Sequence, residues 1–342
     1  MAFITKINEV RAVIDNTYVG EPNWDEIADS ASAAMVDAVG DRWSYYLTAA
    51  QYVDYMNSVN NISSGIGISI LQDEETGEIG IVSVSNNSPA EKAGIVAGDI
   101  LLSVAGHAVT GLLPADVKSI VQSQEGEFVI ILRGADGQER EATVKVETFH
   151  SNPVSYKMLD NSIGYIRIQN FDGGCAEGAI EAIEDLRTQG MQSVIFDVRT
   201  NPGGLLNELL DLLDYILPEG ELFISVSEQG EEQIFTSGAE CMDKIPMVVM
   251  IDANSYSAAE FFAAALSEYE YATIIGQAST GKSRSQQTFM LTDGSAVHIS
   301  TRSYLTPHRR DLAAEGGLIP DVSVENIVGK DLQLEEATKY LS

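Results

Sequence analysis

The spacing of apolar and polar residues changes twice along the chain. Up to about residue 60, apolar side chains recur three and four positions apart, as on one face of a helix, in INEVRAVIDNTYV and in WDEIADSASAAMVDAV. From Ser63 to about Glu147, short runs rich in β-branched residues alternate with glycine turns. From about residue 150, strand-like runs alternate with amphipathic helices. The pattern predicts a helical region, a small β-rich module and an α/β region, in that order.

The β-rich module is predicted to combine short strands with two short helices. Its β segments are GIGISIL, GEIGIVSVS, GDILLSVAGHAV, EFVIILRG and REATVKVETF. The first helix has Ser88 as its N-cap and Pro89 at its first position, and it ends near Gly94. The second helix is PADVKSIVQS.

The α/β region is predicted to form a layered sheet. Its runs SVIFDV and MVVMID are apolar on both faces, which is typical of parallel strands covered by helices on both sides. Helix-like segments such as LLNELLDLLDYIL and AAEFFAAALSEY alternate with these strands. Because such sheets bind ligands in the loops that follow the strands, three of these loops are the places to search for chemistry.

Charge and composition argue against two classes of binding partner, nucleic acids and anionic membranes. The 342 residues include 51 acidic and 20 basic side chains, which gives a formal net charge of −31. Nucleic acid and anionic membrane surfaces both attract clustered lysine and arginine, so neither is an expected partner. A hydrophobic content of 44% favours a folded protein over a disordered acidic one.

Cysteine, histidine and long apolar runs are scarce. Cys175 and Cys241 make neither a disulfide framework nor a zinc-site spacing, and with four histidines we expect no metal site and no other cofactor. No run of eighteen apolar residues predicts a membrane span. The start, MAFITKINEVRAV, lacks the pattern of a signal peptide. Either the protein is not exported, or an export segment lies outside this sequence.

The first loop runs from Asp197 to Gly204, with the sequence DVRTNPGG, between a buried strand and a helix. Two glycines before a helix N-terminus leave N–H groups at the positive end of the helix dipole, which suits an anion or a developing oxyanion. The same glycines also fit a plain tight turn. Spacing alone leaves both interpretations open.

The second loop, Asn254 to Glu260, also joins a strand to a helix. Ser257 and Glu260 fit the capping box S-x-x-E, which by itself makes Ser257 a helix cap. In the functional interpretation, Ser257 is a nucleophile at the positive helix end, and the Ala258 N–H binds an oxyanion. A nucleophilic serine also requires a base.

The third loop, Gly276 to Ser283, matches the phosphate-binding pattern G-x-x-x-x-G-K-[ST]. A phosphate loop needs a helix that begins at its Lys-Ser pair, so that the helix dipole faces the phosphates. The residues after Ser283 instead predict a β-hairpin made of TFML, the turn TDG and SAVHIST. A nucleotide hydrolase is therefore kept only as an alternative.

Lys282, in this third loop, is the candidate base for Ser257. His298 lies within a predicted strand as a packed or surface residue, and His308 stands beside two arginines that disfavour its cationic form. A lysine acts as a base where burial lowers its pKa, and serine–lysine pairs are a known variant of the catalytic triad.

Four segments, in order, resemble those of the carboxyl-terminal processing peptidases (tail-specific proteases, serine peptidase family S41). They are DVRTNPGGLL, ANSYSAAEFFAAAL, GQASTGKSRSQQ and SYLTPHRRDLAAEGGLIPDV. The β-rich module resembles a PDZ domain, in which GIGISI is similar to the carboxylate-binding loop and SPAEKAGIVAGDILLSVAG to the bacterial PDZ core. The resemblance covers about residues 5 to 325.

The resemblance implies a role for each matching residue. The nucleophile is Ser257, the general base is Lys282, and Gln286 orients the lysine. Amides of Ala258 and Gly203 make the oxyanion hole.

In the PDZ-like module, the resemblance implies a site for a substrate C-terminus. The matching residues are Gly65, Ile66, Gly67 and Ile68. The sequence departs from the family pattern at three other places: Ser283 replaces a glycine, Tyr256 replaces a small residue, and residues 308–317 are only loosely similar.

These inferences predict an α/β peptidase core of the crotonase-like layered type, with a PDZ domain and an N-terminal helical region. The predicted division is residues 1–62, 63–148 and 149–330, with a C-terminal helix at 331–342. The predicted function is a serine endopeptidase that cleaves polypeptides near their C-terminus, which the PDZ domain docks. The alternatives are a P-loop nucleotide hydrolase through Gly276–Ser283 and an inactive PDZ-type peptide-binding protein.

The expected partners are unfolded or C-terminally exposed polypeptides. A second copy of the chain, bound through the terminal helices, is a further candidate partner. The resemblance suggests a location in the cell envelope or elsewhere outside the cytoplasm.

Overall fold

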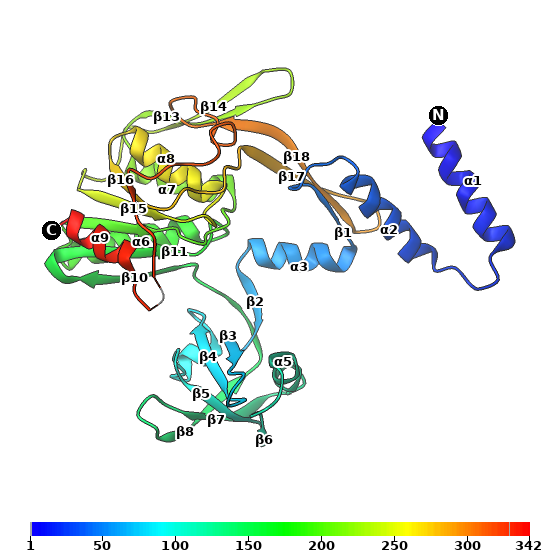
Figure 1. Ribbon diagram of the computed structural model, residues 1–342, viewed down its shortest axis with the longest axis horizontal. Helices are drawn as coiled ribbons and strands as arrows, with labels where there is room; N and C mark the ends of the chain where they lie inside the picture. The colour runs from blue at the N-terminus through cyan, green and yellow to red at the C-terminus, as the bar shows by residue number, and fades with distance from the viewer. Residues whose placement is uncertain (1, 328) are drawn as a thin grey trace. The chain divides into compact units, whose positions relative to one another are not determined.

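The computed structural model describes residues 2–327 and 329–342 (Figure 1). The chain forms two compact units, Met1–Tyr55 with Arg284–Ser303, and Met56–Ser283 with Tyr304–Ser342. In the described part of the chain, no helix is both long and apolar enough to cross a bilayer.

The first unit combines N-terminal helices with a small antiparallel sheet. The helices are α1 (Ala2–Thr17), α2 (Trp24–Asp37) and the greater part of α3 (Ala49–Val59). Strand β18 (Ala296–Leu305), whose last two residues belong to the second unit, pairs antiparallel with β1 (Tyr45–Leu47) and with β17 (Arg284–Met290). The Asn23 side chain caps α2 by accepting the Glu26 N–H at 3.4 Å.

The second unit contains the β-rich module, which has a hydrophobic core of its own. Its sheet has the order β3-β4-β5-β7-β8, with β6 beside β5. The strands are β3 (Ile68–Gln72), β4 (Ile79–Val84), β5 (Ile100–Val104), β6 (His107–Ala108), β7 (Glu127–Arg133) and β8 (Glu139–Lys145). The helices are α4 (Pro89–Lys92) and α5 (Pro114–Gln122). Outside this sheet, β2 (Ile62–Gly65) pairs with β9 (Glu147–His150), so the module begins and ends at one place.

The second unit also contains a six-stranded sheet of order β10-β11-β12-β15-β16-β19. Its strands are β10 (Val154–Leu159), β11 (Ile163–Ile168), β12 (Ser193–Asp197), β15 (Met247–Ile251), β16 (Ala272–Gly276) and β19 (Val322–Ser323). The β10–β11 pair is antiparallel and the other pairs are parallel. A 3₁₀ turn (Asp160–Ser162) joins β10 to β11. Outside this sheet, β13 (Gly220–Val226) forms an antiparallel pair with β14 (Glu232–Ser237).

Helices cover both faces of the six-stranded sheet. They are α6 (Cys175–Thr188), α7 (Leu206–Ile216), α8 (Ala258–Glu268) and α9 (Leu332–Tyr340). Within β15, Val249 and Ile251 pack into the core shared with α6, α7 and α8, whereas Val248 and Met250 pack into the core that includes α9. This explains why MVVMI is apolar throughout, since alternate side chains enter two different cores.

Parallel pairing places the ends of β12, β15 and β16 at one edge of this sheet. We call the loops that follow these strands the glycine loop (residues 198–205), the serine loop (252–257) and the lysine loop (277–283). They contain the three motifs that the sequence singled out, at the edge where open α/β sheets bind ligands.

Candidate active site

Backbone hydrogen bonds hold the three loops together. The Tyr256 N–H donates to the Asn201 carbonyl at 3.1 Å, which joins the serine loop to the glycine loop. The Thr280 N–H donates to the Ser255 carbonyl at 3.1 Å, which joins the lysine loop to the serine loop. The motifs that lie far apart in the sequence therefore form one site.

Ser257, at the start of α8, has a strained backbone. Its φ of 58° and ψ of −124° are unfavourable for a residue with a side chain and cost on the order of 1–3 kcal/mol. Gly203 lies directly against it, because a Cβ atom at Gly203 would be 2.7 Å from Ser257 Cβ and 2.9 Å from Ala258 N. Only glycine permits this approach of the glycine loop to the serine.

Glu260 is fully buried and connects the serine loop to the lysine loop. Its carboxylate accepts the Ser257 N–H at 2.9 Å, the Lys282 N–H at 2.9 Å and the Gly281 N–H at 2.5 Å. It also accepts the Ser279 hydroxyl. Four donors satisfy this buried carboxylate, and burial without them would be strongly unfavourable. The sequence identified the bond to Ser257 as a capping box but missed the bonds to the lysine loop.

The lysine loop does not have the structure of a phosphate loop. Strand β17 begins at Arg284, directly after the Lys282-Ser283 pair, where a phosphate loop would begin a helix. The Gly281 and Lys282 amides, which a phosphate would need, are bound to the Glu260 carboxylate. The segment therefore matches the P-loop pattern in sequence without forming the P-loop structure.

Tyr304, at the end of β18, is a buried member of the site that the sequence did not single out. Its ring lies 5.1 Å from the ring of Phe223 and 5.8 Å from that of Phe261, between centroids. Its hydroxyl donates to the Lys282 carbonyl. Burial raises the pKa of Tyr304. In the sequence, this residue is simply an aromatic residue in a strand.

The two predicted oxyanion donors differ in their present partners. Among the described residues, nothing accepts the Ala258 N–H. The Gly203 N–H donates to Asn201 Oδ1 at 2.8 Å, and the buried Asn201 side chain also donates to the Ile168 carbonyl at 2.9 Å. The Ala258 amide is thus ready to bind an oxygen, whereas the Gly203 amide is occupied by a side chain.

A buried charge network holds the start of the glycine loop. Asp197 accepts hydrogen bonds from Arg199 at 2.7 and 2.9 Å and from Arg167 at 2.9 Å. Burial alone would raise the pKa of Asp197, but these two arginines hold it below its ordinary value. Arg199 also reaches Asp331, the N-cap of α9, at 2.7 and 2.9 Å. These bonds therefore connect the glycine loop to α9, which covers the face of the sheet opposite α6, α7 and α8.

Gln286, the predicted partner of the lysine, lies in β17 of the first unit. There its side-chain amide donates to Ser300 Oγ and to the Arg284 carbonyl, both at 2.9 Å. Its role beside Lys282 stays a prediction. His298, which we did not select as the base, stacks on Tyr45 with ring centroids 4.6 Å apart.

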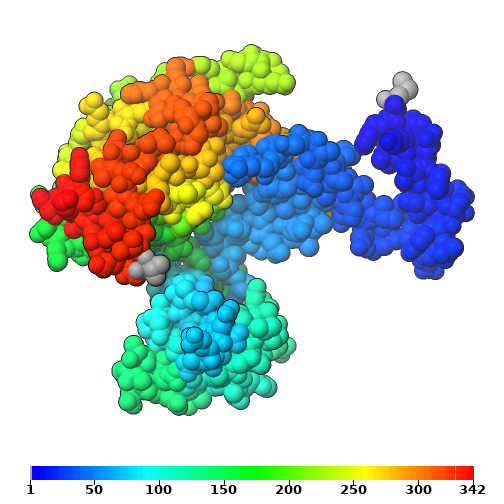
Figure 2. Space-filling model, viewed as in Figure 1, coloured from blue at the N-terminus to red at the C-terminus, as the bar shows by residue number. Residues whose placement is uncertain are grey.

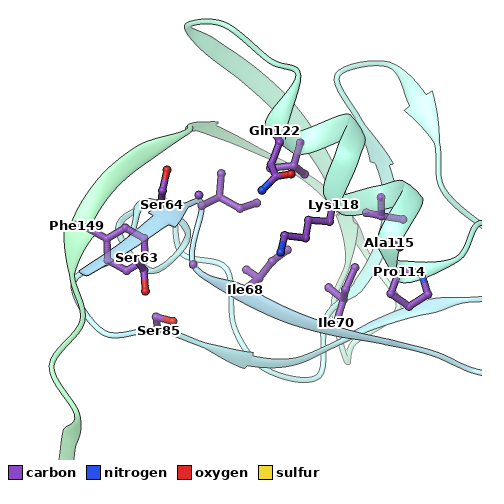
Figure 3. Close-up of a pocket in the computed structure, with 15 residues that line it drawn as sticks. Ser63, Ser64, Ile68, Ile70, Ser85, Pro114, Ala115, Lys118, Gln122 and Phe149 are labelled. Carbon is purple, nitrogen blue, oxygen red and sulfur yellow. The ribbon is translucent and has the colours of Figure 1, made fainter. Parts of the chain in front are cut away.

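The β-rich module has a groove of about 440 Å³ between β3 and α5, which we call the α5–β3 groove (Figure 3). The predicted carboxylate loop, Gly65 to Ile68, lines one end of it. The carbonyls of Ile66 and Gly67 accept the N–H groups of Ala90 at 2.9 Å and Ser85 at 2.8 Å. In contrast, the amides of Ile66 and Gly67 donate to no residue in the described chain.

Glycine is required at position 67, in this loop. Gly67 has a φ of 80°, and a Cβ atom there would lie 2.2 Å from Ser88 Cβ. Lys118 reaches from α5 toward Ile68 across the groove (Figure 3). The groove therefore combines unpaired amides, an apolar wall and one cationic side chain.

Comparison with known families matches two parts of the chain. Residues 162–324 match peptidase family S41, and this segment includes Ser257 and Lys282. Residues 80–133 match a PDZ domain model, which covers most of the β-rich module but begins after the carboxylate loop.

Two proteins of similar sequence cover nearly all of the chain. A protein of Staphylococcus epidermidis named "Probable CtpA-like serine protease" is 30% identical over 326 residues, which cover 94% of this chain and 66% of that protein. The carboxy-terminal processing protease CtpA of Bacillus subtilis is 29% identical over 322 residues, with 94% of this chain and 68% of that protein covered. The chain thus spans about two thirds of the length of these relatives.

A solved structure has the same fold. The photosystem II D1 C-terminal processing protease matches with a TM-score of 0.56 at 24% identity, covering 97% of this chain and 90% of that one. The fold predicted from the resemblance, an S41-type α/β domain with a PDZ domain, is confirmed at this level.

Proposed function

This chain belongs to peptidase family S41 and contains a PDZ domain, and from that premise we propose that it is a serine endopeptidase that cleaves polypeptides near their C-terminus. The observation that carries the proposal is the Glu260 carboxylate, which holds the Ser257 and Lys282 amides at 2.9 Å each. One buried group thereby fixes the backbone of the nucleophile and of the base together.

The proposed reaction is acyl transfer to water. Neutral Lys282 takes the proton from Ser257 Oγ as this oxygen attacks the carbonyl carbon of a peptide bond. The lysine then gives the proton to the departing amine, which leaves an ester on Ser257. Water, deprotonated by the same lysine, attacks the ester, and the carboxylic acid product leaves as the serine regains its proton. Gln286 is proposed to orient Lys282.

The oxyanion of the tetrahedral intermediate is proposed to bind two amides. The Ala258 N–H has no acceptor among the described residues and lies at the positive end of α8. The Gly203 N–H becomes the second donor when the substrate oxygen replaces Asn201 Oδ1. Gly203 fits this role because it lies against Ser257.

The α5–β3 groove is proposed to dock the C-terminus of the substrate. The unpaired amides of Ile66 and Gly67 suit a carboxylate, and the apolar wall suits the last side chain. We therefore expect substrates to be unfolded polypeptides or polypeptides with an accessible C-terminus.

A second copy of the chain is proposed to cover helix α1. This helix, dark blue in Figure 2, has no buried residue. It exposes Phe3, Ile4, Ile7, Val10 and Val13 at helical spacing. A short helix is only marginally stable in water unless it packs against another surface. The apolar stripe of α1 is a surface on which a second copy can pack. Light scattering should show a dimer or larger assembly that Ile7→Asp dissociates, and a monomeric wild-type chain would contradict this proposal.

Two finer structural predictions remain part of the proposal. The first is the crotonase-like layering, which the cover of helices on both faces of the six-stranded sheet supports. The second is the division at residues 62, 148 and 330, which the pairing of β2 with β9 supports at the first two boundaries.

The decisive experiment compares wild type with Ser257→Ala and Lys282→Arg on an unstructured polypeptide. We expect wild type to form an acyl-enzyme, visible as a mass increase of the intact protein. Both variants should lose at least ~10³-fold in activity, because an arginine stays charged and the two residues act as a unit. Wild-type turnover by either variant would contradict the proposed chemistry. A folded wild-type chain that binds peptide without cleaving it would favour the inactive PDZ-type alternative.

A further inference from the structure

The α5–β3 groove contains one charged side chain, that of Lys118. Of the fifteen described residues that line the groove, the rest are apolar or uncharged (Figure 3). The chain has a net charge of −31, yet no aspartate or glutamate is among these lining residues. A lysine in an otherwise uncharged groove attracts a negatively charged ligand. The groove is therefore locally cationic in a strongly acidic chain.

Lys118 has no carboxylate partner in the described chain, unlike most cations of the β-rich module. Arg133, Arg140 and Lys145 each form a salt bridge with an aspartate or glutamate of the module. Lys118 takes part in no salt bridge with a described residue, although Asp116 is two positions before it in α5. Residues two apart on a helix do not face each other. The ammonium group of Lys118 is thus unpaired before a ligand binds.

Strand β3 has an edge along which an extended peptide can pair. It is the end strand in the order β3-β4-β5-β7-β8, and β4 is its one partner among the described strands. The predicted carboxylate loop, Gly65 to Ile68, leads directly into β3. A peptide whose carboxylate lies at this loop therefore runs antiparallel to β3, as a strand added to the sheet.

In such a strand, alternate side chains of the peptide face the groove. They belong to the last residue and the third from last, whose side chains are about 6.8 Å apart. The last side chain is next to the loop, where Ile66 and Phe149 supply an apolar surface. Lys118 lies farther from the loop, one helical turn of about 5.4 Å before Gln122 on α5 (Figure 3). Because this turn is close to the strand repeat, the third residue from the end meets Lys118.

We propose that the α5–β3 groove selects polypeptides that have aspartate or glutamate as the third residue from the C-terminus, and that Lys118 binds this side chain. The inference deepens the proposed docking of a substrate C-terminus and rests on it. A lysine keeps its ammonium group near water while its methylene chain covers apolar surface. Here that surface includes Ile68, toward which Lys118 reaches (Figure 3). The ion pair therefore forms without leaving a buried charge unpaired.

The test measures peptide binding to the full chain carrying Ser257→Ala, so that bound peptide is not cleaved. Three labelled peptides of one sequence carry Glu, Gln or Lys as the third residue from a free C-terminus. We expect the Glu peptide to bind about three- to fivefold more tightly than the Gln peptide, and the Lys peptide to bind most weakly. A fourth peptide has Glu second from the end, where the side chain points away from the groove, and it should gain nothing. Fluorescence polarisation gives the four affinities.

Substitutions of Lys118 test which residue makes the selection. Lys118→Gln should remove the preference, and Lys118→Glu should reverse it in favour of the Lys peptide. Lys92→Glu is the matched control, because Lys92 is also an exposed lysine of the module but does not line the groove. It should leave the order of affinities unchanged. Raising the salt to ~0.5 M should reduce the wild-type preference, since exposed charges are screened.

The possible failures of this proposal are distinguishable from those of the docking itself. Equal affinity for the Glu and Gln peptides, with free acids still bound more tightly than amides, would overturn the inference and leave the docking intact. A Glu preference that persists in Lys118→Gln would likewise overturn it. If none of the peptides binds, both the inference and the docking role are wrong, whatever Ser257 does.

Discussion

The candidate active site and the α5–β3 groove differ in whether their backbone amides have hydrogen-bond acceptors. Around Ser257, the amides of Ser257, Gly281 and Lys282 are bound to Glu260, and that of Gly203 is bound to Asn201. In the groove, the carbonyls of the carboxylate loop are satisfied, whereas the amides of Ile66 and Gly67 are not.

This difference follows from what each site has to do. A binding loop attracts a carboxylate with donors that are unpaired before the ligand arrives. A catalytic site needs its reacting groups held in one geometry, and internal hydrogen bonds supply that rigidity. Beside Ser257, the proposed nucleophile, the Ala258 amide has no acceptor among the described residues, as is the case for the Ile66 and Gly67 amides in the groove.

The largest expected effect comes from Glu260→Gln, which breaks the internal bonding of the active site. A glutamine places an NH₂ group where a carboxylate oxygen now accepts N–H donors, so at least one buried contact becomes repulsive. We expect a loss of about 2–4 kcal/mol in the free energy of unfolding. We also expect a fall in kcat of at least ~100-fold, since both loops are released. Urea unfolding and steady-state kinetics measure the two effects.

Glu208→Gln is the control for this prediction. Glu208 also accepts two amides at the start of a helix, those of Gly174 at 3.2 Å and Ala176 at 2.8 Å. Among the described residues, the hydrogen bonds of the Glu208 carboxylate go to Gly174 and Ala176 and none goes to the serine or lysine loop. A smaller loss of stability with nearly wild-type kcat is expected. Equal kinetic effects of the two substitutions would mean that Glu260 has only a structural role.

An intermediate effect is expected in the groove. A peptide with a free, apolar C-terminal residue should bind the full chain carrying Ser257→Ala about tenfold more tightly than its C-terminal amide, because a charged acceptor makes stronger hydrogen bonds with the loop amides. Fluorescence polarisation with a labelled peptide measures both affinities.

Gly67→Ala separates the groove from any other peptide site. The substitution adds a Cβ atom where Ser88 Cβ lies 2.2 Å away, at a φ of 80°, so it should deform the loop. It should weaken binding of the acid and remove the preference over the amide. Equal affinity for acid and amide in the parent chain would rule out the carboxylate-docking role.

The smallest expected effect concerns Asp172, a carboxyl next to the glycine loop that lacks the donors Glu260 has. Burial, together with the charge of Glu208, raises the pKa of Asp172 to about 6. Because the folded pKa is above the unfolded one, the folded state binds the proton more tightly, and stability rises as the pH falls from about 6 to about 4. Above pH 6 the ionised group destabilises the fold.

Asp172→Asn removes this ionisation. We expect the variant to be about 1–2 kcal/mol more stable than wild type at pH 7.5, with the partial exposure of the side chain taken into account, and nearly equal to it at pH 4. Urea unfolding at both pH values measures the difference. A difference that is the same at both pH values would show that Asp172 does not titrate as its surroundings indicate.

The sequence alone determined the elements and the motifs. Two-faced apolar runs such as SVIFD and MVVMI specify covered parallel strands, because alternate side chains enter two cores. The start of α4 follows from Ser88-Pro89, since the Ser88 hydroxyl caps the Glu91 amide at 3.1 Å. The sequence also singled out Ser257, Lys282 and the Gly65–Ile68 loop as candidate site residues, because local patterns and family resemblance mark residues next to strand ends and glycine turns; their roles stay predictions.

Only the tertiary structure decided which groups meet at the active site. Glu260 was visible as the cap of one helix, but its bonds to Gly281 and Lys282 connect segments about twenty residues apart, for which no local pattern exists. Tyr304 carries no sequence signal beyond an aromatic residue in a strand, and only the fold brings its hydroxyl to the Lys282 carbonyl. The sequence also left the Gly276–Ser283 match open, and the strand that follows it resolved that ambiguity. The local spacing of residues encodes helix and strand propensity and the capping of helix ends. Contacts between loops depend instead on the register in which the strands that precede those loops are paired.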